Sequence, residues 1–302
     1  MALHYSVPAK INWFICVTGK RDDGYHDLLS VMQCVSLYDE LTVQPGDTIE
    51  LVTEMNTPTE MNIPTEMNIP TEDNLVFKAA SLLCAHTGCK KGARLHLKKV
   101  IPAEAGLGGG SSDCAYTLIA LNRLWGLGLT TEQLKALGAK LGSDVPFFVD
   151  GNCAFVSGRG EIVTPLEINT TYDILIIKPP FSVSTAQAYK KIRTFTNCAS
   201  LNHPNNHIGE RFRDALNKKD LDTILPLMRN DIQEAIKADY PMIDEICSYL
   251  LQIGALKAML SGSGSAVFGV FDATQKAHAQ DALMYLPAGC RGFWTKTLKR
   301  IY

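Results

Sequence analysis

The sequence predicts an α+β protein built from two lobes, residues 1–163 and residues 164–302. The chain has 302 residues, of which 46% are hydrophobic, and chains of this length divide into two domains more often than they form one. Segments with the alternation typical of strands and segments with the periodicity typical of helices are interspersed along both halves. The change from one lobe to the other is expected near residues 161–171.

In the N-terminal half, Asn74 is expected to cap a helix that runs to about His86, with Gly88 beyond its end. A strand at 93–100 and a glycine-rich loop come next. A second helix is then expected from Ser112 to Trp125, and Thr130 with Gln133 forms the capping box of a third. The other expected elements are strands at 11–17, 31–35, 40–43 and 48–52, a polar turn at 18–24, a strand entered at 143–149, and a hairpin turned at 158–160.

The C-terminal half is expected to begin with an apolar strand at 172–178, which Pro179 and Pro180 end. Amphipathic patterns and apolar runs follow it in turn. They predict helices at 206–217, 220–229, 231–238 and 241–253, and strands at 256–260, 266–271 and 291–298.

A tandem repeat interrupts the first lobe. Met-Asn-x-Pro-Thr-Glu occurs three times, at 55–60, 61–66 and 67–72. A proline every six residues excludes a regular helix and makes a central strand unfavourable. Three units are too few for a solenoid, whose repeats need neighbours on both sides. The repeat is therefore interpreted as an expanded surface loop.

Composition excludes several classes of function. The net charge is −2, and the 29 basic and 31 acidic residues are interspersed, so the basic surface of a nucleic-acid-binding protein is absent. The nine cysteines are an odd, scattered set without a C-x-x-C pair, which favours a reducing compartment over a disulfide framework. No signal peptide and no apolar run of about 20 residues is present. We expect a cytoplasmic protein without a membrane or nucleic-acid partner.

The strongest functional motif is the glycine-rich loop from Pro102 to Asp113, with the sequence Pro-Ala-Glu-Ala-Gly-Leu-Gly-Gly-Gly-Ser-Ser-Asp. Four glycines in five positions let the backbone approach a ligand closely. The free N–H groups and the positive dipole end of the following helix favour an anion there, and triphosphate is the natural ligand. The loop differs from a Walker A loop because no Gly-Lys-Ser/Thr follows.

Two polar motifs near the N-terminus accompany this loop. Strand periodicity places Lys10 and Asn12 on one face, where they could orient a hydroxyl and a phosphate oxygen together. Gly24-Tyr25-His26 follows the polar turn and combines an aromatic ring with an imidazole. This pair suits a heterocyclic ligand, although each motif alone also fits a solvated strand end or a packed turn.

Two further motifs have both a structural and a functional interpretation. In Gly-Ser-Asp144-Val-Pro-Phe, a carboxylate lies between a helix end and an apolar segment, where it could cap backbone N–H groups or accept a proton. Ser261-Gly-Ser-Gly-Ser265 joins two apolar strands. It is either a simple tight turn or a second backbone cradle that faces the glycine-rich loop.

As a set, these segments resemble the superfamily of galactokinase, homoserine kinase, mevalonate kinase and phosphomevalonate kinase. Its three signature segments match 8–12, 102–113 and 261–265 in order. Arg21-x-Asp23-Gly-Tyr-His and Ser-Asp144-Val-Pro-Phe-Phe are most similar to the branch that phosphorylates 4-diphosphocytidyl-2-C-methyl-D-erythritol in the non-mevalonate isoprenoid pathway. The resemblance covers nearly the whole chain and departs from the family at the repeat.

The resemblance implies a ribosomal-protein-S5-like N-terminal lobe, a ferredoxin-like C-terminal lobe and an active site in the cleft between them. It implies Lys10 and Asp144 as the catalytic pair. For ATP it implies the loop residues Pro102, Gly106, Leu107, Gly108, Gly109, Gly110, Ser111 and Ser112, with Asn74 and Lys99 on the adenine side. For the cytidine substrate it implies Asn12, Tyr25, His26, Thr185 and Tyr189.

The implied reaction is the transfer of the γ-phosphoryl group of ATP to the 2-hydroxyl of the cytidine substrate, with Mg²⁺. The metal ligands are unassigned, with Ser111 or Asp113 as candidates, and the chain is expected to be a monomer or a weak homodimer. Two alternatives stay open: a kinase for homoserine or a mevalonate derivative, and a non-catalytic nucleotide-binding protein on the same fold. The Gly24-Tyr25-His26 motif argues against the first, and the presence of both Lys10 and Asp144 argues against the second.

Overall fold

A computed structural model describes the chain except for residues 1, 56–70, 196–207, 273–274 and 300–302. The described residues form two compact units made of discontinuous stretches. Unit 1 consists of Met1–Ala9, Leu37–Ala103 and Gly108–Asp150, and unit 2 consists of Lys10–Ser36, Glu104–Leu107 and Gly151–Tyr302. Because each unit consists of three separate stretches, no single boundary in the sequence divides one unit from the other. The division at residue 163 stays a prediction.

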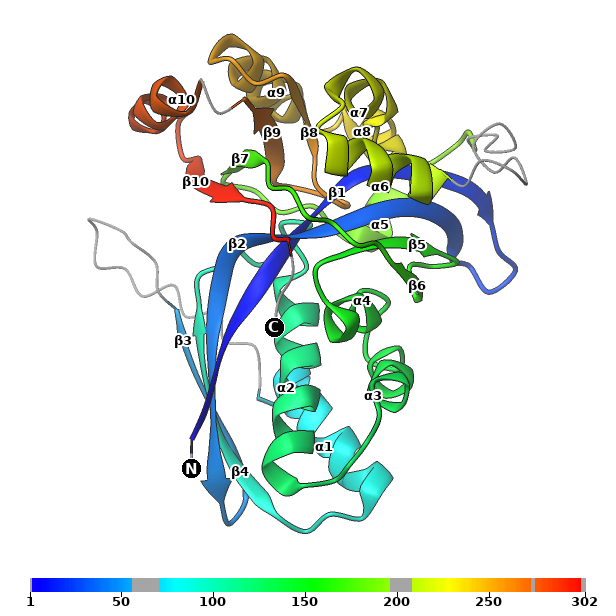
Figure 1. Cartoon of the computed structure of the whole chain (residues 1–302), viewed down its shortest axis with the longest axis vertical. Coiled ribbons are helices and arrows are strands. Elements are labelled where there is room, and N and C mark those ends of the chain that lie inside the picture. Colours follow the sequence, from blue (N-terminus) through cyan, green and yellow to red (C-terminus); the bar gives the residue numbers. More distant parts are fainter. Residues whose placement is uncertain (1, 56–70, 196–207, 273–274, 300–302) are drawn as a thin grey trace. The chain divides into compact units, whose positions relative to one another are not determined.

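Unit 1 is a sheet with helices on one face. Strand β4 (Gly92–Lys99) pairs antiparallel with the second half of β2 (His26–Gly46) and parallel with β3 (Ile49–Met55). The first residues of β1 (Leu3–Lys20) also belong to this unit. Figure 1 shows α1 and α2 side by side on one face of these strands. The helices are η1 (Thr71–Asp73), α1 (Leu75–Thr87), α2 (Gly109–Trp125), α3 (Thr131–Gly138) and α4 (Val145–Asp150).

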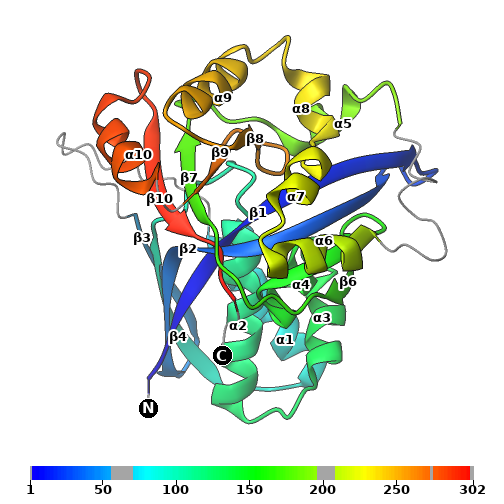
Figure 2. The same ribbon diagram turned by 45° about the horizontal axis from the view of Figure 1, so that its top comes forward.

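The C-terminal part of unit 2 contains an antiparallel sheet whose order, within the described residues, is β10-β7-β9-β8. Its strands are β7 (Asp173–Lys178), β8 (Lys257–Leu260), β9 (Val267–Phe271) and β10 (Arg291–Lys296). In chain order this sheet reads 4-1-3-2 with helices after its first and third strands, which is the ferredoxin-like βαββαβ arrangement. Helix α9 packs on β8 and β9, as Figure 2 shows. The predicted α+β class and the ferredoxin-like lobe are confirmed.

The rest of unit 2 is a second set of strands and a group of short helices. The hairpin of β5 (Cys153–Ser157) and β6 (Ile162–Pro165) pairs through β5 with residues 30–33 of β2. Buried aliphatic side chains from β1, β7, α8, α9 and β9 form a shared core. The helices are α5 (Thr185–Lys190), α6 (Ile208–Lys218), α7 (Leu221–Leu227), α8 (Asp231–Ile236), α9 (Met242–Gln252), α10 (Lys276–Ala282) and η4 (Leu283–Tyr285).

The main differences from the predicted elements lie in α4, β2 and α2. The strand expected at 143–149 is helix α4, because Pro146 in a first helical turn loses no hydrogen bond and has a helical φ. The strands expected at 31–35 and 40–43 are parts of one strand, β2, since no proline or glycine interrupts residues 31–43. Helix α2 begins at Gly109, three residues before the expected Ser112. The repeat at 55–72 lies almost entirely outside the described residues.

Candidate active site

The glycine-rich loop contributes residues to both units. Pro102, Ala103 and the residues from Gly108 onward belong to unit 1, and Glu104–Leu107 belong to unit 2. The predicted site residues are therefore divided between the two units.

In unit 1, the loop leads directly into the first turn of α2. Gly108 is the N-cap, and its carbonyl accepts the first helical hydrogen bond from the Ser112 amide at 2.9 Å. Gly109 lies so close to Ile101 that an added Cβ would be 2.9 Å from the Ile101 Cγ2. No side chain caps this helix end. The amides of the first turn, which have no acceptor within a helix, are therefore not covered by an N-cap side chain.

A buried cluster of three charged residues, Lys99, Asp39 and Asp113, lies at the start of α2. Lys99, at the end of β4, directs its ammonium to Asp113 Oδ2 at 2.6 Å and to the carboxylate of Asp39. Asp39 Oδ1 also accepts the amides of Val100 at 2.5 Å and Ile101 at 2.8 Å. The cluster thus connects β2, β4 and the start of α2 within unit 1.

Burial and the neighbouring charges shift the pKa values of Lys99 and Asp113. Burial lowers the pKa of Lys99, but the attraction of Asp113 and Asp39 outweighs burial, so its pKa is raised and the ammonium stays charged. Burial raises the pKa of Asp113 to about 7, against the attraction of Lys99 and with the repulsion of Asp39. Asp113 Oδ1 and Ser112 Oγ are buried and have no hydrogen-bond partner among the described residues. The first five residues of α2 therefore include two side-chain oxygen atoms that have no partner among the described residues.

The raised pKa of Asp113 gives a testable pH dependence. A folded-state pKa above the unfolded value makes a contribution to stability that is complete below the unfolded pKa and is lost as the pH rises through about 7. Asp113→Asn cannot ionise and avoids this loss. Relative to wild type, we expect its free energy of unfolding to improve by about 1 kcal/mol between pH 6 and 8.

Chemical denaturation at several pH values, in EDTA and without nucleotide, measures this difference. Asp73→Asn is the control, because Asp73 is exposed and pairs with Lys78 at 3.2 Å. Its difference from wild type should not change with pH in the same range. A flat or opposite trend for Asp113→Asn would contradict a folded-state pKa of about 7 for the Asp113 carboxyl.

The remaining predicted residues of unit 1 lie in distinct local settings. Asn74 caps α1, with its Oδ1 accepting the Val76 amide at 2.9 Å, and Pro102 is buried. Asp144 is half-buried in the turn immediately before α4. The side-chain oxygen of Asn74 and the ammonium of Lys99 are thus engaged within the fold, and a contact of either residue with adenine stays a prediction.

In unit 2, Lys10 and Asn12 share one face of β1, as the strand periodicity predicts. Both are almost completely buried. Lys10 Nζ donates to Asn12 Oδ1 at 2.7 Å, and Asn12 Nδ2 donates to Ser30 Oγ at 2.9 Å. Ser30 in turn donates to the Phe14 carbonyl at 2.5 Å. This chain of hydrogen bonds fixes the orientation of the Asn12 amide and holds the ammonium of Lys10 in a defined place.

The serine-glycine turn at 261–265 contacts the glycine-rich loop, as one of its two interpretations predicts. Ser261 Oγ donates to the Gly106 carbonyl at 3.1 Å, and the Ala266 amide donates to the Ala105 carbonyl at 3.1 Å. The Lys10 amide donates to the Leu107 carbonyl at 2.9 Å. Within unit 2, residues from three distant parts of the chain therefore meet around 105–107.

Asn230 holds this turn in place. Its Nδ2 donates to the carbonyls of Leu260 at 2.9 Å and Gly262 at 2.8 Å, while its Oδ1 caps α8. Asn230 is not among the site residues predicted from the sequence. An asparagine before an aspartate at a helix start was the available signal, and it indicates only a cap.

The predicted substrate residues also lie in unit 2, in two settings. Tyr25 is exposed, with 53% of its surface accessible, whereas His26 is buried. The rings of His26 and Tyr189 are 5.4 Å apart, and Thr185 Oγ1 lies 2.7 Å from Ser263 Oγ. Burial, followed by the charge of Lys20, lowers the pKa of His26, so its imidazole is neutral at pH 7. A neutral imidazole offers one donor and one acceptor to a heterocycle.

Comparisons with known proteins identify the family of the chain. The family model described as "GHMP kinases N terminal domain" matches residues 74–152, and "GHMP kinases C terminal" matches 212–286. The 4-diphosphocytidyl-2-C-methyl-D-erythritol kinase of Thermodesulfovibrio yellowstonii is 42% identical over 294 residues, which cover 97% of this chain and 96% of that protein. The chain belongs to the 4-diphosphocytidyl-2-C-methyl-D-erythritol kinase family.

A second relative and two solved structures are also similar to the chain. The kinase of the same name from Gloeobacter violaceus is 37% identical and covers 90% of this chain and 86% of that protein. A crystal structure of 4-(cytidine 5'-diphospho)-2C-methyl-D-erythritol kinase has a TM-score of 0.77 at 31% identity and covers 98% of this chain and 99% of that one. Homoserine kinase from Cytophaga hutchinsonii, with a TM-score of 0.71 at 18% identity, shares the fold.

The family assignment makes the chain a kinase, that is, a phosphotransferase. Among the described residues, no helix is both long and apolar enough to cross a membrane. The described cysteines are all free thiols, and Cys34, Cys114 and Cys153 are among the buried ones.

Proposed function

We propose that the chain transfers the γ-phosphoryl group of ATP to the 2-hydroxyl of 4-diphosphocytidyl-2-C-methyl-D-erythritol, a step of the non-mevalonate isoprenoid pathway. The observation that carries this proposal is the 42% identity, over 97% of the chain, to a kinase named for this substrate. The exposed ring of Tyr25 and the neutral imidazole of His26 support a heterocyclic ligand.

Each reacting group has a proposed residue. As the bond from the substrate oxygen to the γ-phosphorus forms and the bond to ADP breaks, Lys10 orients the hydroxyl and lowers its pKa, and Asp144 accepts the proton. The loop residues Gly106–Gly110, with Ser111 and Ser112, hold the phosphates through backbone amides and the helix dipole. Asn12, Tyr25, His26, Thr185 and Tyr189 contact the cytidine substrate.

The adenine side of ATP is assigned to Asn74 and Lys99. Because the Asn74 side-chain oxygen caps α1 and the Lys99 ammonium binds two carboxylates, such contacts would use the other atoms of these residues. Pro102, the first residue of the loop, is also proposed to contact ATP.

Mg²⁺ is the proposed metal ion, and when bound it would neutralise charge on the phosphates of ATP. The start of α2 fits such an ion: Ser112 Oγ and Asp113 Oδ1 are oxygen donors, and both are buried without a partner among the described residues. Asp113 and the neighbouring Ser111 are the ligands proposed from the sequence, and Ser112 is the addition that the structure suggests.

The cysteines and the charge distribution bear on the compartment and the partners of the enzyme. Free thiols among the described cysteines support a reducing, cytoplasmic compartment. A net charge of −2 with interspersed signs gives no support for a nucleic-acid partner. We propose a monomer or a weak homodimer that binds ATP and a cytidine diphosphate derivative.

Turnover with alternative acceptors tests the activity. ADP release coupled to NADH oxidation should be observed with 4-diphosphocytidyl-2-C-methyl-D-erythritol and not with homoserine or mevalonate. CMP and CDP should compete with the acceptor. Turnover with homoserine or mevalonate but not with the cytidine compound would refute the proposed substrate, and ATP binding without transfer to any of the three would favour the non-catalytic alternative.

The Tyr25 ring provides a second test of the same substrate. Base stacking on an aromatic ring contributes about 1–3 kcal/mol, so Tyr25→Ala should raise KM for the cytidine substrate roughly 5- to 150-fold. KM for ATP should hardly change. Tyr285→Ala is the matched control, because Tyr285 is also exposed, at 79%. If Tyr25→Ala alters the kinetics of ATP and acceptor equally, Tyr25 does not stack on the base.

A further inference from the structure

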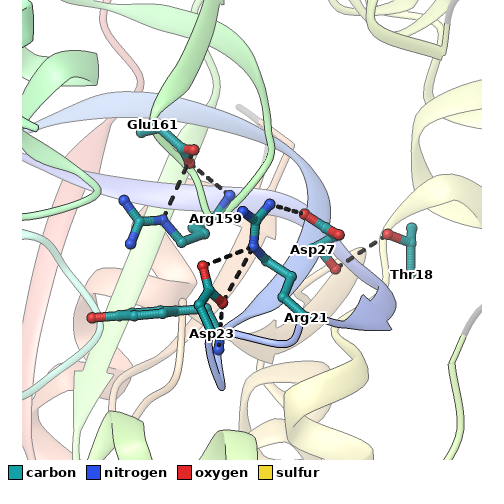
Figure 3. A network of polar contacts seen from close by, with 7 residues as sticks. Thr18, Arg21, Asp23, Asp27, Arg159 and Glu161 are labelled. Carbon is teal, nitrogen blue, oxygen red and sulfur yellow. Dashed lines mark hydrogen bonds and ion pairs between the residues drawn. The ribbon is translucent and has the colours of Figure 1, made fainter.

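The turn that carries Tyr25 is held by a network of charged side chains. Arg21 Nε donates to Asp23 at 3.2 Å and Arg21 Nη1 donates to Asp27 at 3.0 Å, so one guanidinium lies between two carboxylates (Figure 3). Asp23 Oδ1 accepts the Tyr25 amide at 3.1 Å, and the Arg21 amide donates to the Tyr25 carbonyl at 2.9 Å. Both backbone polar groups of Tyr25 are therefore fixed within the turn.

The side chain of Tyr25 has a different kind of support. The guanidinium carbon of Arg159 lies 4.6 Å from the centroid of the Tyr25 ring, well within the range of a cation–π contact. The guanidinium covers one side of the ring, while 53% of the Tyr25 surface remains accessible. The ring therefore contacts a guanidinium and still has accessible surface for a second partner.

Arg159 is itself held in place by the hairpin of β5 and β6. Glu161 Oε2 accepts the Arg159 amide at 2.6 Å, and Glu161 Oε1 lies 3.9 Å from Arg159 Nε. The Gly158 carbonyl accepts the Leu28 amide at 2.8 Å, which joins this hairpin turn to β2. Figure 3 shows Arg159 and Glu161 together beside the Arg21 network. The side chain that covers Tyr25 therefore comes from a turn with its own hydrogen bonds.

The charge of Asp23 favours the placement of the Arg21 and Arg159 guanidinium groups next to Tyr25. The hydrogen bond from the Tyr25 amide, and then the guanidinium groups of Arg21 and Arg159, lower the pKa of Asp23. Asp23 is therefore ionised at neutral pH, and it attracts the Arg159 guanidinium as well as that of Arg21. Two segments that are more than 130 residues apart in sequence are linked through one aromatic ring and one carboxylate.

We propose that Arg159 is a positioning residue for substrate recognition, which holds the Tyr25 ring in the orientation that stacks on the cytosine base. This inference rests on the proposed function, in which Tyr25 contacts the cytidine. An exposed tyrosine samples several rotamers, and fixing it on binding costs conformational entropy. Because Arg159 orders the ring beforehand, this cost is reduced, and the benefit appears in the binding of the cytidine substrate.

A direct contact of Arg159 with the substrate diphosphate is the competing explanation, and a double-mutant cycle separates the two. If Arg159 acts through Tyr25, removing Arg159 has no further effect once the ring is absent. The double variant should then resemble Tyr25→Ala alone. If Arg159 binds the substrate itself, the two effects should multiply, because independent contributions are additive in free energy.

The experiment measures KM and kcat for four test variants and one control variant, each with the cytidine substrate and with ATP. We expect Arg159→Gln to raise KM for the cytidine substrate about 3- to 30-fold, with kcat changed by less than about 2-fold and KM for ATP unchanged. Arg159→Lys keeps the charge but loses the planar group, so its KM should be intermediate. Tyr25→Ala and the double variant complete the cycle. Arg94→Gln is the matched control, because Arg94 pairs with Glu50 at 3.0 Å on an exposed surface.

Three results would overturn the proposal: an unchanged KM in Arg159→Gln, effects that multiply in the double variant, or a loss of kcat in proportion to a loss of thermal stability. If the wild-type protein does not phosphorylate the cytidine compound, the proposed function fails on its own. The contact is then tested without substrate by ¹³C relaxation of the labelled Tyr25 ring. The ring should become more mobile in Arg159→Gln and not in Arg94→Gln, and equal mobility would refute the positioning role.

Discussion

Asp144→Asn should lower kcat by roughly 10²–10⁴-fold while leaving the fold and ATP binding nearly intact. Asp144 lies half-buried in the turn before α4, and we propose it as the group that accepts the proton of the substrate hydroxyl. An amide has nearly the same size and keeps a hydrogen-bonding oxygen, but it cannot accept the proton. Steady-state kinetics with the cytidine substrate, ATP titration and thermal melting measure the three quantities.

A carboxylate at the other end of the same helix supplies the control. Asp150 Oδ2 lies 2.6 Å from Lys135 Nζ, so Asp150→Asn should lower the melting temperature and leave kcat close to the wild-type value. The proposed role of Asp144 would be refuted if Asp144→Asn behaved like this control, because the carboxylate would then act only as a structural cap.

Gly106→Ala should produce the largest loss of stability among the single substitutions considered for the loop. A Cβ on Gly106 would lie 1.9 Å from the Ser261 carbonyl oxygen, and φ at Gly106 is +73°. The clash requires backbone movement, and the left-handed conformation is unfavourable for alanine. We expect the free energy of unfolding to fall by about 2–5 kcal/mol. Activity should fall with it, because the loop that we propose to bind the phosphates would be displaced.

Gly88→Ala separates the cost of the steric clash from the cost of the left-handed backbone conformation. Gly88 has a similar φ of +70°, but nothing lies within 4 Å of its Cβ position, so only the backbone term of about 1–2 kcal/mol should appear. Urea denaturation and kcat/KM of both variants give the comparison. Equal destabilisation by the two substitutions would mean that the loop moves away from Ser261 without cost, and the contact between 105–107 and 261–266 would have no role in holding the loop.

Elements governed by local interactions were predicted from the sequence. The Asn74 cap and Gly88 fix the two ends of α1, and Thr130 with Gln133 forms the predicted capping box of α3. These signals act between residues fewer than five positions apart, so they can be recognised without knowledge of the fold. For the same reason, strand alternation placed Lys10 and Asn12 on one face, and the density of glycines identified the loop before α2.

Only the tertiary structure decided where the long-range partners of these motifs lie. The sequence gives no sign that Lys99 meets Asp39 and Asp113, that Arg159 covers the ring of Tyr25, or that Asn230 holds the turn after Leu260. Each contact joins segments brought together by packing, and the identity of a single residue does not select its distant partner. The segment at 145–150 was ambiguous for a related reason: a short apolar run suits a buried strand or a buried helix equally, and its surroundings determine which forms.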